Sequence, residues 1–190
     1  MEGIHFSSAI DRRLYRRALA FATEKHAGQV RIGGLPYITH PVAVAEIVHA
    51  RDLGIDYVVA GLFHDLLEDT DADEEKIGKL GGASVLRAVR LLTKTPGYVM
   101  EDYVAGIRSD PISYAVKGAD RLHNLRCALC TEEAFKQRYV RESVAWYLDF
   151  MPEIPDAVAA LARSMATPPA EAQYLLRTRT VAGEEASSEK

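Results

Sequence analysis

The sequence predicts an all-α fold of about eight helices. Apolar residues recur at the three- and four-residue spacing of helices along most of the chain. Glycines, prolines and helix-capping residues separate these stretches at short intervals. No stretch shows the strict apolar–polar alternation of a half-buried strand, and no internal repeat stands out. We therefore expect helices packed around one core.

Capping residues, glycines and prolines set the expected boundaries of each helix. Ser8 or its neighbour can cap the first helix, whose buried face should include Ile10 and Phe21. Asp56 can cap the third helix, and Asp110 followed by proline is the strongest helix start. The expected helices cover residues 8–27, 41–53, 56–67, 73–81, 84–92, 100–108, 111 onward, 131–150 and 156–165, with a further turn near 174–176.

Length and composition are those of a soluble globular protein. The 190 residues suffice for one sizeable core, and 48% are hydrophobic and 26% charged. The net charge of −4 gives no basic field that would attract a nucleic acid polymer or an anionic membrane. Since no apolar run reaches membrane-spanning length and no signal-peptide pattern occurs, we expect a cytoplasmic protein. The oligomeric state stays open.

An imidazole and a carboxylate, His64 and Asp65, lie side by side within the almost wholly apolar stretch 58–67. A buried carboxylate is costly unless a cation or several hydrogen bonds offset its lost hydration. A metal ion bound to both residues would offset this cost. The alternative without a metal is a structural histidine beside a capping aspartate. Glu68 and Asp69 follow at the i+4 positions and share the faces of their predecessors.

Two more candidate ligands lie on other expected helices: His40 at the start of the second, and Asp120 beside the apolar stripe of the helix from 111. With the His–Asp pair they supply two imidazoles and two carboxylates, which suit Mn²⁺, Fe²⁺ or Co²⁺. Fewer than six protein ligands leave room for water, as in catalytic sites. Glu68 or Asp69 could accept a proton from that water.

Several polar side chains could bind a phosphate-containing substrate. Asn124 shares a helical face with Asp120 and could donate a hydrogen bond to a substrate oxygen. The positive residues that could bind phosphate are Arg31, Lys94, Lys117 and Arg121. The spacing of ligands, base and cations thus favours a metallohydrolase of a small anionic ester.

Four ordered motifs, at residues 25–31, 36–41, 63–70 and 117–124, also resemble those of the HD-domain superfamily. They are most similar to the hydrolase domain of the RelA/SpoT alarmone enzymes and to small stand-alone ppGpp hydrolases. The resemblance covers roughly residues 10–150. It implies an HD-domain helical bundle over residues 1–166 and a partly disordered C-terminal extension over 167–190. The synthetase half of the family is not expected.

The resemblance also implies roles for individual residues. One Mn²⁺ would be held by His40, His64, Asp65 and Asp120, and water would be activated by Glu68 and Asp69. The implied substrate is (p)ppGpp, cleaved at the 3′ position to release pyrophosphate and GDP or GTP. Contacts to that substrate are implied for Arg31 against the guanine and for Tyr37 and Asn124 at sugar or phosphate.

Two departures from the family pattern leave the substrate open. Ile32 stands where a lysine is usual after Arg31, and Gly118 replaces a bulkier apolar residue. Alternatives are a related phosphohydrolase of another nucleotide, such as the 2′-phosphate of NADPH, a 3′-phosphorylated nucleotide or a nucleoside monophosphate, and a non-catalytic nucleotide-sensing module. The lone CxxC of Cys127 and Cys130 favours two reduced thiols over a redox pair. His5, His26, His49 and His123 are interpreted as structural.

Overall fold

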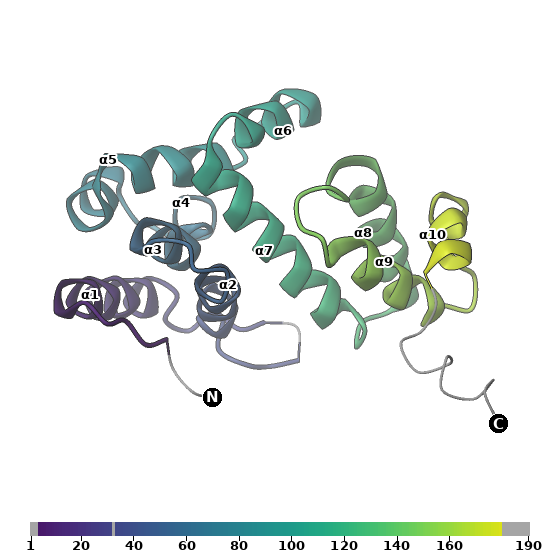
Figure 1. Ribbon diagram of the computed structural model, residues 1–190, viewed down its shortest axis with the longest axis horizontal. Coiled ribbons are helices and arrows are strands. Elements are labelled where there is room, and N and C mark those ends of the chain that lie inside the picture. The colour runs from purple at the N-terminus through teal and green to yellow at the C-terminus, as the bar shows by residue number, and fades with distance from the viewer. Residues whose placement is uncertain (1–3, 32, 180–190) are drawn as a thin grey trace. The chain divides into compact units, whose positions relative to one another are not determined.

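The computed structural model describes residues 4–31 and 33–179, which form two compact units. The all-α prediction is confirmed, because no strand occurs in the described ranges beyond an isolated bridge between Val30 and Pro36. The first unit ends at Asp120, inside α7 (Figure 1). It contains α1 (Ala9–Lys25), α2 (Thr39–His49), α3 (Ile55–Phe63), α4 (Leu66–Asp69), α5 (Glu74–Leu92), α6 (Met100–Arg108) and the first half of α7 (Pro111–Ala128).

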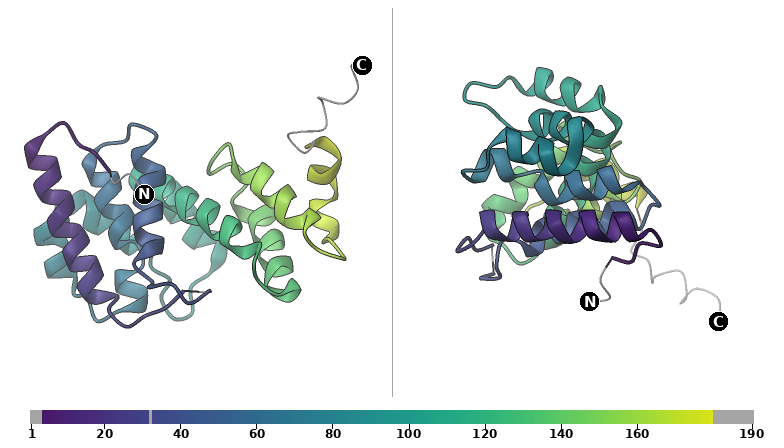
Figure 2. Two further views of the ribbon diagram at one scale, coloured as in Figure 1. Left: turned by 90° about the horizontal axis from the view of Figure 1, so that it is seen from below. Right: turned by 90° about the vertical axis from the view of Figure 1, so that its left-hand side faces the viewer.

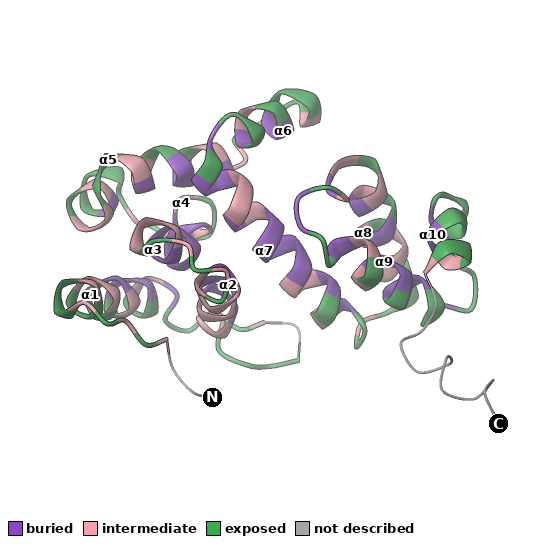
Figure 3. Cartoon of the chain, viewed as in Figure 1, coloured by how far each residue is buried: buried purple, intermediate pink, exposed green. Residues whose placement is uncertain are grey.

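Helix α3 is the centre of the first unit and packs against α1, α2 and α5. Its residues 58–63 are all buried, as expected for a helix that is apolar on every side (Figure 3). The rings of Phe63 and Phe21, from α3 and α1, meet edge to face at 5.7 Å. Figure 2 shows the neighbouring helices α1, α2 and α3 of this unit from two further directions.

Helices α2 and α3 approach closely at Gly61. A Cβ atom on this glycine would lie 3.2 Å from both the Cα and the N atom of Ala45. Backbone atoms cannot move aside as a flexible side chain can, so any larger residue must push the two helices apart. The close packing of α2 on α3 therefore depends on glycine at this position.

We expect Gly61→Ala to lower the free energy of unfolding by about 1–3 kcal/mol, the usual cost of overpacking. Denaturant unfolding of the two proteins would measure it. Gly106→Ala in α6 is the matched control, because its Cβ would meet only the end of the Leu91 side chain at 3.4 Å. Equal stability of Gly61→Ala and Gly106→Ala would contradict the close approach.

Most of the predicted boundaries agree with the structure, but several details differ, among them the end of α8, which stops at Trp146 and not at residue 150. Asp110 caps α7 as predicted, accepting hydrogen bonds from the N–H groups of Ile112 and Ser113. The prediction for Ile10 is wrong: it is 79% exposed, because the buried face of α1 starts further along the helix. Gly54, not Asp56, is the N-cap of α3. Helix α2 begins before its proline, at Thr39, which places the histidine of the motif in the first turn.

The two short helices expected around Gly82 are both present, as two helical segments of α5 that meet at a kink at that residue. Gly82 has φ 85° and ψ 175°, a conformation that residues with a Cβ rarely adopt. The glycine pair therefore interrupts the helix where the sequence predicts a break, and the prediction of two helical segments is confirmed.

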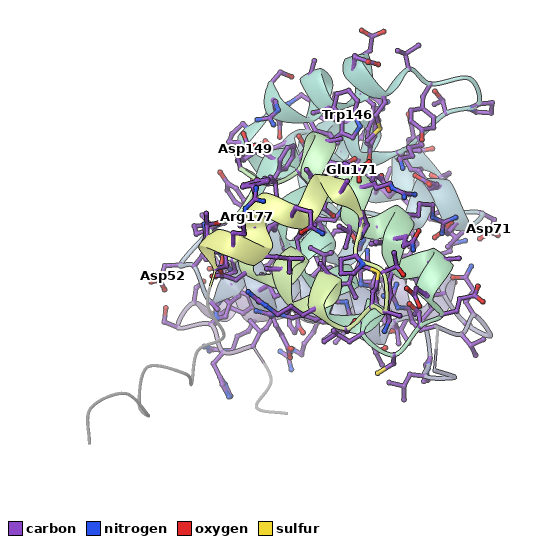
Figure 4. All side chains as sticks on the ribbon, turned by 90° about the vertical axis from the view of Figure 1, so that its right-hand side faces the viewer. Asp52, Asp71, Trp146, Asp149, Glu171 and Arg177 are labelled. Atoms are coloured by element: carbon purple, nitrogen blue, oxygen red, sulfur yellow. The ribbon has the colours of Figure 1, made fainter. Side chains whose placement is uncertain are left out.

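The second unit contains the end of α7 followed by α8 (Glu133–Trp146), α9 (Ile154–Arg163), a 3₁₀ turn (Ala170–Ala172) and α10 (Gln173–Thr178). Helix α9 packs against α8 and α10. Arg179, just after α10, donates a 2.9 Å hydrogen bond to Asp156 of α9. Figure 4 shows Glu171 and Arg177 on the last helical turns.

Some predictions fall outside the described ranges or stay untested. Ile32 and the C-terminal tail from residue 180 lie outside the described residues. The domain boundary at 166/167 stays a prediction. Within the described ranges, no helix is both long enough and apolar enough to cross a membrane.

Candidate metal centre

Four of the predicted residues converge in the first unit. The Nε2 atoms of His40 and His64 are 3.2 Å apart. Asp65 Oδ2 lies 3.0 Å from the Nε2 atom of His64 and 3.6 Å from that of His40. Asp120 Oδ1 lies 3.2 Å from the Nε2 atom of His40 and 3.8 Å from that of His64. Side chains from α2, from α7 and from the segment between α3 and α4 thus converge on one point.

A break in the predicted helix 56–67 makes this convergence possible. Helix α3 ends at Phe63 and α4 starts at Leu66, so His64 and Asp65 occupy the turn between them. In a regular helix, adjacent side chains point about 100° apart and do not face each other. The turn, in which Asp65 has φ −100° and ψ −1°, lets both reach a common point. The prediction of one continuous helix here is wrong.

The hydrogen bond of His64 orients its ring. Its Nδ1 atom lies 2.8 Å from the backbone carbonyl of Gly61, to which it can only donate. In the neutral ring, the lone pair is then on Nε2, the atom that faces His40 and the two carboxylates. This is the arrangement in which histidine binds a metal, with the second ring nitrogen held by a backbone carbonyl.

Burial and charge act on the titration of these groups in opposite directions. Burial lowers the pKa of His40. Burial would also lower the pKa of His64, but the carboxylates of Asp65 and Asp120 raise it to about 9. Burial raises the pKa of both carboxyls, yet His64 beside Asp65 and Lys117 beside Asp120 hold them below the usual range. Both acids are therefore ionised, and an arriving cation would compete with a proton for the imidazoles.

The donor set fits a divalent ion. Ligands bonded to one ion at about 2.0–2.2 Å lie about 3.0–3.6 Å from one another, close to the separations seen here. Among the described residues, the donor atoms of His40, His64 and Asp65 all lie within 4.8 Å of one another. His40 and His64 are buried, whereas the Asp65 side chain is 21% exposed, so solvent reaches one side of the centre.

Tyr37 contacts the centre through its hydroxyl group. The hydroxyl lies 2.7 Å from Asp65 Oδ2 and 3.1 Å from Asp69 Oδ2. Burial and the two carboxylates raise the pKa of Tyr37, so the hydroxyl keeps its proton and can donate. A substrate contact is expected for this residue from its motif, and in the structure its hydroxyl contacts two acids of the site.

Two residues to which the sequence analysis gave no role at the site, Gln29 and His26, support the same region. The Gln29 amide donates to the backbone carbonyl of Asp69 at 2.7 Å, and its oxygen lies 2.7 Å from His26 Nδ1. The His26 ring lies against the Tyr37 ring at 4.8 Å. Both residues belong to the motif 25–31, which is the only signal in the sequence that could have indicated them.

The two candidate base residues lie on α4, beside the centre. The carboxylate of Glu68 is exposed and accepts a 2.9 Å hydrogen bond from the backbone N–H of Lys94. The backbone N–H of Asp69 donates to the carbonyl of Asp65 at 2.9 Å, which ties α4 to the turn. The i+4 relation predicted between Asp65 and Asp69 therefore survives the break in the helix.

The predicted cations have different surroundings. Lys117 donates to Asp120 Oδ2 at 2.9 Å, and Lys94 lies 5.4 Å from the ring centre of Tyr103. Arg31 lies 5.7 Å from the ring centre of Tyr37. All of these residues belong to the first unit.

Arg121 and Asn124 lie further along α7, in the second unit. Arg121 is buried, bonded to Glu142 at 2.9 Å and stacked over the rings of Tyr139 and Tyr147 at 4.9 and 4.2 Å. Asn124 follows Asp120 by one helical turn. The guanidinium of Arg121 thus contacts residues of its own unit.

Comparison with known protein families agrees with this geometry. Residues 18–97 match the profile of the HD domain. This match includes the first three predicted ligands and both acids of α4, while Asp120 lies beyond its end.

Curated relatives match a longer stretch. A probable guanosine-3′,5′-bis(diphosphate) 3′-pyrophosphohydrolase of Synechocystis is 39% identical over 140 residues, which cover 67% of this chain and 18% of that protein. The bifunctional (p)ppGpp synthase/hydrolase SpoT of Escherichia coli K12 is 33% identical over 143 residues, 70% of this chain and 20% of that protein. The chain thus spans about a fifth of the length of these relatives.

A solved structure shares the fold over nearly the whole chain. It is that of a metazoan ortholog of SpoT that hydrolyses ppGpp, with a TM-score of 0.61 and 24% identity. The likeness covers 92% of this chain and 97% of that one. It confirms the expected HD-type helical fold.

Proposed function

We propose that this chain, whose residues 18–97 match the HD domain, hydrolyses (p)ppGpp at the 3′ position with the help of Mn²⁺. The products would be pyrophosphate and GDP or GTP. The observation that carries the proposal is the convergence of His40, His64, Asp65 and Asp120 on one point. The names of the curated relatives supply the substrate class.

The four converging side chains would hold the ion. When bound, a divalent ion supplies a Lewis acid that makes water a nucleophile at neutral pH and polarises a phosphoryl oxygen. Glu68 and Asp69, on α4 beside the centre, would accept the proton of the attacking water. Glu68 is kept in place by the backbone N–H of Lys94.

The remaining side chains would bind the nucleotide. Lys94 and Lys117 both lie within 6 Å of the Tyr103 ring, at 5.4 and 5.8 Å, and would attract the phosphates. Arg31 would lie against the guanine and Asn124 would contact sugar or phosphate. Arg121, buried among aromatic rings, would support α7 and not bind substrate directly.

A nucleotide panel assayed with Mn²⁺ tests the substrate. We expect the highest kcat/KM for ppGpp or pppGpp, with pyrophosphate as product. One alternative is a related phosphohydrolase that acts on another nucleotide, and it is favoured by Ile32, which stands where the family has lysine. Its substrate would be the 2′-phosphate of NADPH, a 3′-phosphorylated nucleotide or a nucleoside monophosphate. Faster turnover of one of these would reject the alarmone, and binding without any turnover would indicate a nucleotide-sensing module.

Tyr37→Phe should lower kcat or Mn²⁺ affinity by about 10–100-fold with little change in KM, the usual effect of losing a group that orients metal ligands. The reason is that its hydroxyl bonds Asp65 and Asp69. Steady-state kinetics and Mn²⁺ titration measure both quantities. Tyr174→Phe, at an exposed tyrosine of α10, is the control. A rise in KM alone would show that Tyr37 contacts substrate instead.

A further inference from the structure

The hydrolase site does not use the two cysteines, which lie together at the end of α7 in the second unit. Cys127 is in the last turn of the helix and is partly buried, while Cys130 is exposed in the turn that follows. The N–H of Cys130 donates to the carbonyl of Cys127 at 3.3 Å. Such a turn brings its first and fourth Cα atoms within about 7 Å, and a disulfide bridges Cα atoms about 4.4–6.8 Å apart.

A base lies beside one of the two thiols. The Nε2 and Nδ1 atoms of His123 are 3.7 and 3.9 Å from the sulfur of Cys127, one helical turn away. This base matters because the C-terminal end of a helix carries partial negative charge and disfavours a thiolate. A neighbouring imidazole that takes up the thiol proton counters that effect.

We propose that Cys127 and Cys130 form a dithiol site that is oxidised to an intramolecular disulfide by small disulfides of the glutathione class. His123 accepts the proton of Cys127, and the thiolate attacks one sulfur of the oxidant, which releases one thiol and leaves a mixed disulfide on Cys127. The thiol of Cys130 loses its proton and attacks Cys127 Sγ, which releases the second thiol. The protein loses two hydrogen atoms and the oxidant gains them.

The exposures of the two residues fit this order of events. The partly buried thiol is the one with the base, and the exposed thiol is free to turn onto it. The product would close the turn where α7 ends and the chain continues to α8. The proposal does not depend on the hydrolase function, since its site and its readout are separate from the metal centre.

The test is to equilibrate the full-length protein with oxidised glutathione and then to block the remaining thiols with an alkylating reagent under denaturing conditions. Mass spectrometry measures the mass of the product. We expect a monomer that takes up no alkyl group and whose mass is two hydrogen atoms below that of the reduced protein. Cys130→Ser should accumulate a stable mixed disulfide with glutathione on Cys127. Two alkylated thiols after equilibration, or a cross-linked dimer on a non-reducing gel, would overturn the proposal.

The role of His123 is tested with His123→Gln in the Cys130→Ser background. We expect the rate of mixed-disulfide formation at pH 7 to fall at least about threefold, because no neighbouring base takes up the proton of Cys127. The difference should vanish in strongly alkaline buffer, where hydroxide takes up the thiol proton in place of the imidazole. An equal loss of rate at both pH values would indicate a merely structural histidine and overturn its role as base.

Discussion

Replacing Asp65 with alanine should leave the purified protein without its divalent ion and lower kcat/KM at least about 10³-fold, because several kcal/mol of transition-state stabilisation are lost with the ion. Asp65 Oδ2 lies within 3.6 Å of both imidazole Nε2 atoms, so its removal takes away one of the two carboxylates that His40 and His64 share. Metal analysis and the ppGpp assay measure the two effects separately.

A thermal-shift titration with Mn²⁺ adds a readout that does not depend on substrate. Mn²⁺ at about 100 times its Kd stabilises the folded wild-type protein by about 2.7 kcal/mol, and Asp65→Ala should lose this gain. Asp71→Ala is the matched control, since Asp71, labelled in Figure 4, is exposed and pairs with Lys25 instead of with a residue of the centre. Full metal content and normal activity in Asp65→Ala would exclude Asp65 from the centre.

The second large effect is expected for Glu68→Gln. This change keeps the shape of the side chain and removes its capacity to take a proton, so kcat should fall about 10²-fold or more while the metal content stays unchanged. The glutamine oxygen can still accept the hydrogen bond from the Lys94 N–H, which keeps α4 in place. Single-turnover kinetics would separate the chemical step from product release.

Glu75→Gln on α5 is the control for the second prediction. Glu75 is exposed and pairs with Lys79 one turn later, so its substitution should change neither kcat nor metal content. Unchanged turnover in Glu68→Gln would remove Glu68 from the mechanism and leave Asp69 as the remaining candidate base. Loss of metal in Glu68→Gln would instead indicate that this residue helps to hold the ion.

The helices could be predicted wherever a local signal defines them. Asp110 caps α7 because an aspartate followed by proline satisfies the first N–H groups of a helix in any fold. The break after Phe63 carries no such signal, since the stretch 58–67 is apolar except for His64 and Asp65, and neither glycine nor proline occupies the turn itself. It depends on contacts of His64 and Asp65 with other helices, which lie outside any local window.

The metal centre could be predicted for a different reason. Histidine and aspartate are conspicuous within apolar stretches because burying them is costly, and this indicated His64, Asp65 and Asp120. The supporting contacts could not be predicted in this way. Gln29 and Tyr37 lie in a polar loop where their residue types are ordinary, and only the folded chain brings them to Asp65 and Asp69.

The most direct measurement is X-ray diffraction at the manganese absorption edge from crystals of this protein grown with Mn²⁺. We expect one anomalous peak bonded to the Nε2 atoms of His40 and His64 and to the carboxylates of Asp65 and Asp120, at about 2.0–2.3 Å. Saturating Mn²⁺ with no peak among these four side chains, or a peak bound only by other residues, would contradict it.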